Sequence, residues 1–323
     1  MSFNENVQLD TSQVTGGGSG GGGGFGGGGG GGFPGGVQVG GGIGGIILLI
    51  LGLVFGGGAL GGSGTSDPGT TAQGQGSVLQ PGQVSAGGTQ SSAGFAQCRT
   101  GADANRNDDC LVIATVNSVQ AYWSEALPTY GKQYQPARTV LYSGSTRSKC
   151  GTASNQVGPF YCPLDGLVYI DSSFFAELQQ RFGSDGGQLA KEYVIAHEYG
   201  HRIQDILGVL GRAQQDPQGA ESGSVRLELM ADCLAGTWVN HATQTKDAAG
   251  TTFLKPLSKS DIASALSAAS AVGDDRIQQS VQGRVTPESW THGSSAARQK
   301  WFLAGYSSGD LNQCDTFGVA SVE

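Results

Sequence analysis

The chain has 323 residues, a formal net charge of -8 and an isoelectric point near 5.0, without any visible cluster of Lys or Arg. Binding of nucleic-acid phosphates needs such a basic cluster, so a nucleic-acid partner is excluded. More than half of the 58 glycines precede Cys98, and no Lys or Arg precedes Arg99. From Cys98 onward the composition is ordinary, and that part is long enough for one domain with a sizeable core.

The chain before Cys98 is predicted to contain three segments without a packed core. Residues 1–42 are expected to be a disordered tail, because glycine loses the most entropy on ordering and has no side chain to bury. Residues 43–60 include an uncharged apolar run from Ile46 to Phe55, and with their flanks they reach about 18 residues, the lower end of what crosses a bilayer. Residues 61–96, rich in Gly, Ser, Gln, Thr and Pro, are expected to form a flexible stalk.

A transmembrane helix is the favoured interpretation of residues 43–60. A cleaved signal peptide would begin close to the N-terminus with basic residues, whereas here about 40 residues without a positive charge come first. A buried core helix fits the length, but its glycine-rich flanks offer nothing to pack against. We therefore expect a single span that anchors the chain in the cell membrane. Its orientation cannot be taken from flanking Lys or Arg residues, because there are none.

The cysteines indicate the compartment. All six lie in the globular part and none forms a CxxC pair. This usage is typical of disulfides and of an oxidising environment, which places the domain outside the cytoplasm, whereas buried free thiols in a cytosolic protein are the alternative. Connectivity does not follow from sequence alone. Short separations favour the pairs Cys98–Cys110 and Cys150–Cys162, which leaves Cys233–Cys314.

The globular domain is predicted to span residues 97–317, followed by a short C-terminal tail at 318–323. Apolar periodicity and capping residues predict many helices around a small sheet, which is an α+β fold. Strands are expected at 138–142 and 167–170. Helices are expected at 111–127, 174–182, 189–207, 225–241 and 260–272, with further starts at Thr286 and at Ser294, the last helix running to Ala304.

One motif in the helix at 189–207 indicates a metal site. His197, Glu198 and His201 match the pattern H-E-x-x-H. Residues four apart share one face of a helix, so both imidazoles reach one ion while Glu198 points beside it at the water that the ion activates. The motif alone is short enough to arise by chance. Its helical and apolar context favours zinc.

A catalytic zinc has three protein ligands, so one more is required. The longer signature H-E-x-x-H-x-x-G-x-x-H does not continue, because Gln204 and Leu207 replace its glycine and its third histidine. About 27 residues after His201, Glu228 and Asp232 lie four apart among apolar residues, where buried acids need a cation or a donor. We assign Glu228 as the third ligand and Asp232 as the acceptor that orients a ligand histidine. A solvated helix face is the alternative.

The ligand set predicts hydrolysis at a carbonyl group. Glu198 would act as the general base and return the proton to the leaving amine. His292, in a loop-like segment between two helices, is a candidate donor to the developing oxyanion, although a lone histidine is more often structural. Glu221 is a poorer ligand candidate because its loop is rich in Gly and Ser. His241 is better interpreted as a helix cap or a surface residue.

Several long motifs together carry a family resemblance. They are YCPLDGLVYIDSSFFAEL, YVIAHEYGHRIQDILG, SVRLELMADCLAG, GDDRIQQSVQGRV and THGSSAARQKWFLAGYSSGDLNQCDTF. Across about residues 97 to 317 the chain resembles the bacterial putative neutral zinc metallopeptidases. The resemblance implies a mostly helical zincin-like domain of the gluzincin type, with Zn²⁺ bound by His197, His201 and Glu228, Glu198 as base and Asp232 behind the ligands. It also implies a glycine-rich N-terminal region followed by one hydrophobic span, although the basic residues that members carry near the start are missing here.

Two functions remain open at this point. The favoured one is a peptidase that acts outside the cytoplasmic membrane on peptides or proteins. The alternative is a non-catalytic zinc domain that serves as an envelope scaffold or binds a partner. Such a structural site needs no base, so Glu198 favours the enzyme. A purely structural or adhesive protein would leave the paired acids and histidines unexplained.

Overall fold

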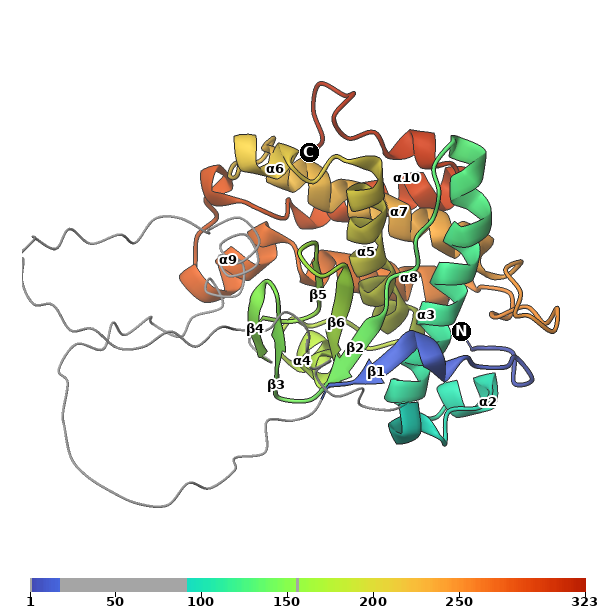
Figure 1. The fold of residues 1–323 in the computed structure, drawn as a ribbon. Coiled ribbons are helices and arrows are strands. Elements are labelled where there is room, and N and C mark those ends of the chain that lie inside the picture. Colours follow the sequence, from blue (N-terminus) through green and yellow to red (C-terminus); the bar gives the residue numbers. More distant parts are fainter. Residues whose placement is uncertain (1, 18–91, 155–156) are drawn as a thin grey trace, which may run out of the picture.

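A computed structural model of the protein describes residues 2–17, 92–154 and 157–323, which are mostly helical with a small sheet (Figure 1). The α+β prediction is confirmed at this level. Within the described ranges no helix is long and apolar enough to cross a membrane. The predicted span at 43–60, the stalk up to residue 91 and the glycine-rich part of the tail lie outside the described residues.

The main sheet has the strand order β1-β2-β6-β5. The first three strands are parallel, and β5 runs antiparallel to β6 at one edge of the sheet. A separate antiparallel hairpin joins β3 and β4. The strands are β1 Val14–Gly16, β2 Thr139–Tyr142, β3 Ser145–Ser148, β4 Gly151–Ser154, β5 Phe160–Cys162 and β6 Leu167–Asp171.

The helices pack around α5, which contacts α3, α7, α8 and the strands β5 and β6 (Figure 1). Large side chains fill the space between them, and Trp123, Trp238, Tyr193, Tyr199 and Phe302 are all fully buried or nearly so. The helices are α2 Gly101–Ala104, α3 Asp108–Ala126, α4 Phe174–Gln180, α5 Gln188–Leu207, α6 Arg212–Gln215, α7 Gly223–Ala242, α8 Lys259–Ala271, α9 Asp274–Gln282 and α10 Ser295–Ser308.

Local capping explains why the helix boundaries lie close to the predicted ones. The side chain of Ser222 accepts a hydrogen bond from Val225 N at the start of α7, and Gly208 ends α5 with a φ of 78°. Two expectations are wrong. The cap of α8 is Ser258 rather than Ser260, because Asp261 completes a capping box with Ser258. The helix expected at Thr286 is only the 3-10 turn Pro287–Ser289.

The prediction of a disordered tail is wrong for residues 2–17. Phe3, Val7 and Val14 have no exposed surface, and β1 pairs with β2 through Val14 and Thr139. The prediction treated residues 1–42 as one segment, and the glycines after residue 15 dominate its composition. The three apolar side chains and the strand that precede most of these glycines were therefore not recognised. The domain therefore begins near the first residues of the chain and continues from residue 92.

The C-terminal tail expected at 318–323 also belongs to the fold. Val322 is fully buried, and its carbonyl accepts a hydrogen bond from Trp301 Nε1 (2.9 Å). The carboxylate of Glu221 accepts a hydrogen bond from Val322 N at 3.0 Å. These contacts hold the end of the chain against α7 and α10.

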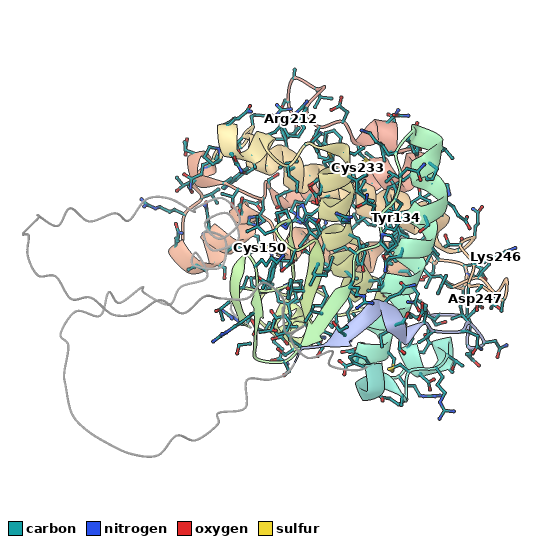
Figure 2. The ribbon with its side chains drawn as sticks, in the orientation of Figure 1. Tyr134, Cys150, Arg212, Cys233, Lys246 and Asp247 are labelled. Carbon is teal, nitrogen blue, oxygen red and sulfur yellow. A yellow bond between two sulfur atoms is a disulfide. The ribbon has the colours of Figure 1, made fainter. Side chains whose placement is uncertain are left out.

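All three predicted disulfides are present: Cys98–Cys110, Cys150–Cys162 and Cys233–Cys314. The last one joins α7 to the 3-10 turn Leu311–Cys314 that follows α10 (Figure 2). Cross-links of this kind reduce the conformational freedom of the unfolded chain. The disulfide therefore fixes the turn after α10 to the middle of α7.

Candidate metal site

The site forms at a close contact between α5 and α7. A Cβ atom added to Gly200 would lie 3.0 Å from the Cα and the carbonyl oxygen of Ala231, so only glycine fits there without displacement. Gly200 is one of the two variable positions of the H-E-x-x-H motif. Its missing side chain therefore allows α7 to bring Glu228 against the histidines of α5.

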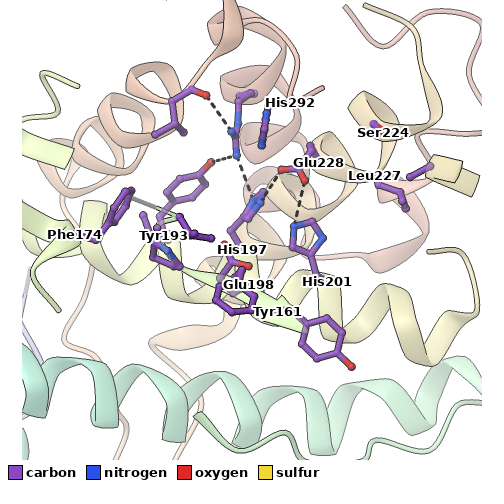
Figure 3. Close-up of a pocket in the computed structure, with 18 of the residues that line it drawn as sticks. Tyr161, Phe174, Tyr193, His197, Glu198, His201, Ser224, Leu227, Glu228 and His292 are labelled. Carbon is purple, nitrogen blue, oxygen red and sulfur yellow. Dashed lines mark hydrogen bonds and ion pairs between the residues drawn. The ribbon is translucent and has the colours of Figure 1, made fainter. Parts of the chain in front are cut away.

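The three predicted ligands meet at this contact (Figure 3). Glu228 Oε2 is 3.1 Å from His197 Nε2, and Glu228 Oε1 is 3.5 Å from His201 Nε2. One ligand atom from each of the three residues lies within 4.8 Å of the others. The structure thus brings together residues from two different helices, α5 and α7.

This donor set fits zinc. Zinc bonds to His nitrogen and carboxylate oxygen are about 2.0 to 2.2 Å long, so tetrahedral ligand atoms are roughly 3.4 Å apart. The separations of 3.1 Å and 3.5 Å are close to that value. Two imidazoles and one carboxylate also leave a fourth position for water or substrate.

Each histidine is held by a hydrogen bond at its other ring nitrogen. His197 Nδ1 donates to Asp232 Oδ1 (2.8 Å), and His201 Nδ1 donates to Gln204 Oε1 (2.9 Å). Gln204 is in turn fixed by donating to the carbonyl of Leu227 at 2.6 Å. Because both acceptors are oxygens that cannot donate, both Nδ1 atoms carry a proton, and Nε2 is the nitrogen of each ring that faces Glu228 and would bind a metal in place of its own proton.

Asp232 is stabilised by a buried arginine that the sequence did not reveal. Arg298 of α10 donates to both of its carboxylate oxygens, from Nε at 2.8 Å and from Nη2 at 2.9 Å. Tyr193, one turn before His197, also donates to Asp232, at 2.5 Å. Asp232 is fully buried and Arg298 is 3% exposed. Both charges have lost their hydration, so each is stabilised by its contact with the other.

The electrostatics of the protein's own groups favour a cation. Burial lowers the pKa of His197, but the charge and the hydrogen bond of Asp232, together with Glu228, outweigh it and raise that pKa to about 10. Burial raises the pKa of Glu228, but the charges of His201 and His292 hold it well below its ordinary value. Glu228 is therefore an anion at neutral pH and suited to be a ligand.

Glu198 lies beside the ligands and lines the same pocket. Glu198 is 7% exposed. Burial raises the pKa of its carboxyl, although the charges of His201 and His197 lower that pKa in part. A raised pKa makes a carboxylate a better proton acceptor near neutral pH. Glu198 is thus placed next to the metal ligands without being one of them.

His292 also lines the pocket, and Asp274 positions its loop. The Oδ2 atom of Asp274 accepts hydrogen bonds from the backbone amides of Thr291 (2.8 Å), His292 (2.6 Å) and Gly293 (3.1 Å). Its Oδ1 atom is 3.4 Å from His292 Nδ1. Burial lowers the pKa of His292, but the charges of Glu228 and Asp274 outweigh it and raise that pKa. His292 therefore lines the pocket with its Nδ1 held between Asp274 and Thr291.

The two weaker candidates from the sequence lie elsewhere. Glu221 binds the C-terminal segment through Ser321 and Val322. His241 Nε2 contacts the carbonyl of Gly309 at 2.9 Å, near the end of α7. Tyr193, Gln204, Asp274 and Arg298 were missed; only Gln204, three residues after His201, and Tyr193, four before His197, had a local signal in their helical spacing.

Comparison with known proteins agrees with this site. A family model described as "Putative neutral zinc metallopeptidase" matches residues 5–317. An uncharacterized protein of Mycobacterium tuberculosis (strain ATCC 25618 / H37Rv) is 56% identical over 229 residues, which cover 71% of this chain and 77% of the relative. The uncharacterized protein YpfJ of Escherichia coli (strain K12) is 44% identical over 213 residues, 64% of this chain and 70% of the relative. No solved structure matches. The family implies Zn²⁺ as the metal of the group formed by His197, His201 and Glu228.

Proposed function

Because the chain belongs to the putative neutral zinc metallopeptidase family, we propose that it hydrolyses peptide bonds, with zinc held by His197, His201 and Glu228. One observation carries the proposal: Glu198 lies in the same pocket as these ligands, with a raised pKa and no role in holding the metal. A purely structural zinc site has no use for such a carboxylate. The substrates are peptides or proteins.

The reaction divides between the metal and the residues around it. Zinc, when bound, polarises the substrate carbonyl and lowers the pKa of water toward neutrality. A carboxylate oxygen of Glu198 accepts the proton of the attacking water and then delivers it to the nitrogen of the leaving amine. His292 donates a hydrogen bond to the carbonyl oxygen as negative charge develops there, and Asp274 keeps the imidazole in place.

We also propose that the domain works outside the cytoplasm. Three disulfides tie the described fold together, and such bonds persist in oxidising compartments and are rare in reducing ones. The association of the domain with the membrane through residues 43–60 remains a prediction from the sequence.

Two substitutions separate the peptidase from a zinc-binding scaffold. Glu198→Gln should leave the zinc content nearly unchanged and lower the rate of peptide hydrolysis by about 10² to 10⁴-fold, since it removes only the base. Glu228→Ala should lose both zinc and activity, because it removes one of three ligands. The measurements are metal stoichiometry by mass spectrometry and hydrolysis of a casein substrate. A Glu198→Gln enzyme with full activity would refute the mechanism, and a wild-type protein that binds zinc but never hydrolyses peptides would favour the scaffold.

A further inference from the structure

The pocket over the metal ligands extends to both sides of them (Figure 3). On one side it is lined by Phe174, Phe182, Val194, Val272 and Ile277, which we call the apolar wing. On the other side lie Leu210, Ala213, Ser224 and Leu227. Figure 3 shows Phe174 and Tyr193 on one side of His197, and Ser224 and Leu227 on the opposite side. A peptide lying across the metal ligands would therefore contact both parts.

The apolar wing continues directly from the catalytic groups. Val194 precedes Glu198 by four residues on α5, so the two side chains lie on one helix face. Phe174 comes from α4, Val272 follows α8 and Ile277 belongs to α9, so three further elements close the wing. A side chain placed in it would be attached to a residue close to the bond that Glu198 helps to cut.

The chemistry of the wing selects apolar groups. The Phe174 and Phe182 rings lie 6.3 Å apart, and both side chains are only partly buried by the protein. Arg181 lies over the Phe182 ring, 5.9 Å from its centroid, and is paired with Glu177 at 3.1 Å. Arg298 is bound by both oxygens of Asp232, so both guanidinium groups already have an acid partner within the protein. An unpaired charge placed there would lose its hydration without compensation.

The opposite side differs in one respect. The hydroxyl of Ser224 is buried and has no hydrogen-bond partner among the described residues. It precedes Glu228 by four residues on α7, so it lies on the helix face that carries the ligand. A buried hydroxyl without a partner favours a polar group of the substrate on that side, which leaves the apolar wing as the place for a hydrophobic side chain.

The size of the pocket points to a single large side chain. The cavity volume of the whole pocket, with the space over the metal ligands and both sides together, is about 170 Å³, so the wing alone has room for no more than about one side chain. An apolar cavity of about 150 Å³ is known to hold a benzene molecule. We propose that the apolar wing binds one bulky apolar side chain, aliphatic or aromatic, of the residue next to the cleaved bond. This specificity rests on the peptidase function proposed above.

The first test measures cleavage by the zinc-loaded full chain. The substrates are peptides that differ only at one position beside a single bond, occupied by Phe, Leu, Ala, Lys or Asp. With Phe or Leu on one side of the bond, kcat/KM should exceed that for Ala by about 10- to 100-fold, and Lys and Asp should give no gain over Ala. Ile277→Trp fills the wing and should remove this preference. Val281→Trp, one turn further along α9 where Val281 is 41% exposed, should retain it.

The second test measures binding and does not require turnover. Alanine, leucine and phenylalanine hydroxamates carry the same metal-chelating group on different side chains, and their affinities can be compared by calorimetry. The Phe and Leu compounds should bind about 10-fold or more tightly than the Ala compound to the wild type and to Val281→Trp, and equally to Ile277→Trp. Peptide cleavage without any side-chain preference, together with equal hydroxamate affinities, would overturn the apolar wing and leave the peptidase function standing. Selective hydroxamate binding without cleavage of any peptide would overturn the peptidase function and leave the wing standing.

Discussion

Asp232 shows how single residues stabilise the metal site from behind. It accepts hydrogen bonds from His197, Tyr193 and Arg298, which come from two different helices. A fully buried carboxylate without such donors would be costly, since its hydration is lost. The orientation of one metal ligand therefore depends on an arginine 66 residues further along the chain.

Removing this arginine should be costly. Arg298→Met leaves the charge of Asp232 buried with only His197 and Tyr193 as donors, and breaking a buried ion pair typically costs about 3 to 5 kcal/mol. We expect a loss of that size in the free energy of unfolding, measured in urea. Arg298→Lys, which keeps the charge but not the two-pronged contact, should lose less. In the double variant Arg298→Met/Asp232→Asn part of the loss should be recovered, and a cost near zero for Arg298→Met alone would show that the pair does not stabilise the fold.

The site residues that lie close together in the sequence could be predicted, whereas those that are distant in the sequence could not. His197, Glu198 and His201 form one local motif, and the spacing of Glu228 and Asp232 marks a second one on the next helix. Arg298 and Asp274 act through long-range packing, and nothing in their own neighbourhood indicates a partner. Local periodicity therefore predicted the ligands, whereas the residues that hold them needed the three-dimensional contacts.

At the scale of elements, the contact between α5 and α7 creates the site. The Cα and carbonyl oxygen of Ala231 are placed so that a Cβ on Gly200 would lie 3.0 Å from either of them. A neighbour at that distance has to move by a few tenths of an ångström. Such a shift of α7 would displace Glu228 relative to His197 and His201. The three residues can bind one zinc ion only if their ligand atoms keep the distances that tetrahedral zinc requires.

Gly200→Ala tests this contact. Helix propensity alone would favour alanine by about 1 kcal/mol, so the metal-free protein should lose little stability. Zinc affinity, measured by competition with a chelator, should fall about 10-fold or more because the ligands are displaced, and Gly200→Val should fall further. Gly208→Ala at the end of the same helix is the control. It has open space but a φ of 78°, so it should lose about 1 to 2 kcal/mol of stability and keep its zinc affinity. Unchanged zinc binding in both Gly200 variants would contradict the role of this contact.

The elements themselves were predictable where their signals are local. Ser222, Ser294 and Gly208 mark helix ends by capping, and α5, α7 and α10 lie close to the expected ranges. Short elements that depend on a partner were not found. β1 has three residues, and only its parallel pairing with β2 makes it a strand. Similarly, α9 was missed because its sequence is polar and short.

At the scale of the whole molecule, residues 2–17 pack onto the fold formed by the described residues from 92 onward. Phe3 is buried and bridges to Leu254, Asp10 N donates to Asn117 Oδ1 at 2.8 Å, and β1 pairs with β2. Residues 2–17 and 92–323 therefore lie on the same side of any membrane. A single crossing at 43–60 would place them on opposite sides, so the expectation of a single-pass anchor conflicts with this fold.

Cysteine labelling in intact cells decides between the two arrangements. Asn6 is exposed in the N-terminal segment and Lys132 is exposed after α3, and all six native cysteines are in disulfides. Asn6→Cys and Lys132→Cys, made separately, should react equally with a maleimide that cannot cross membranes, because both positions belong to one folded body. The control for each variant is the same cells after lysis, where both cysteines must react. If Lys132→Cys were labelled in intact cells while Asn6→Cys required lysis, the N-terminal segment would lie across a membrane from the domain, and its pairing with β2 would be wrong.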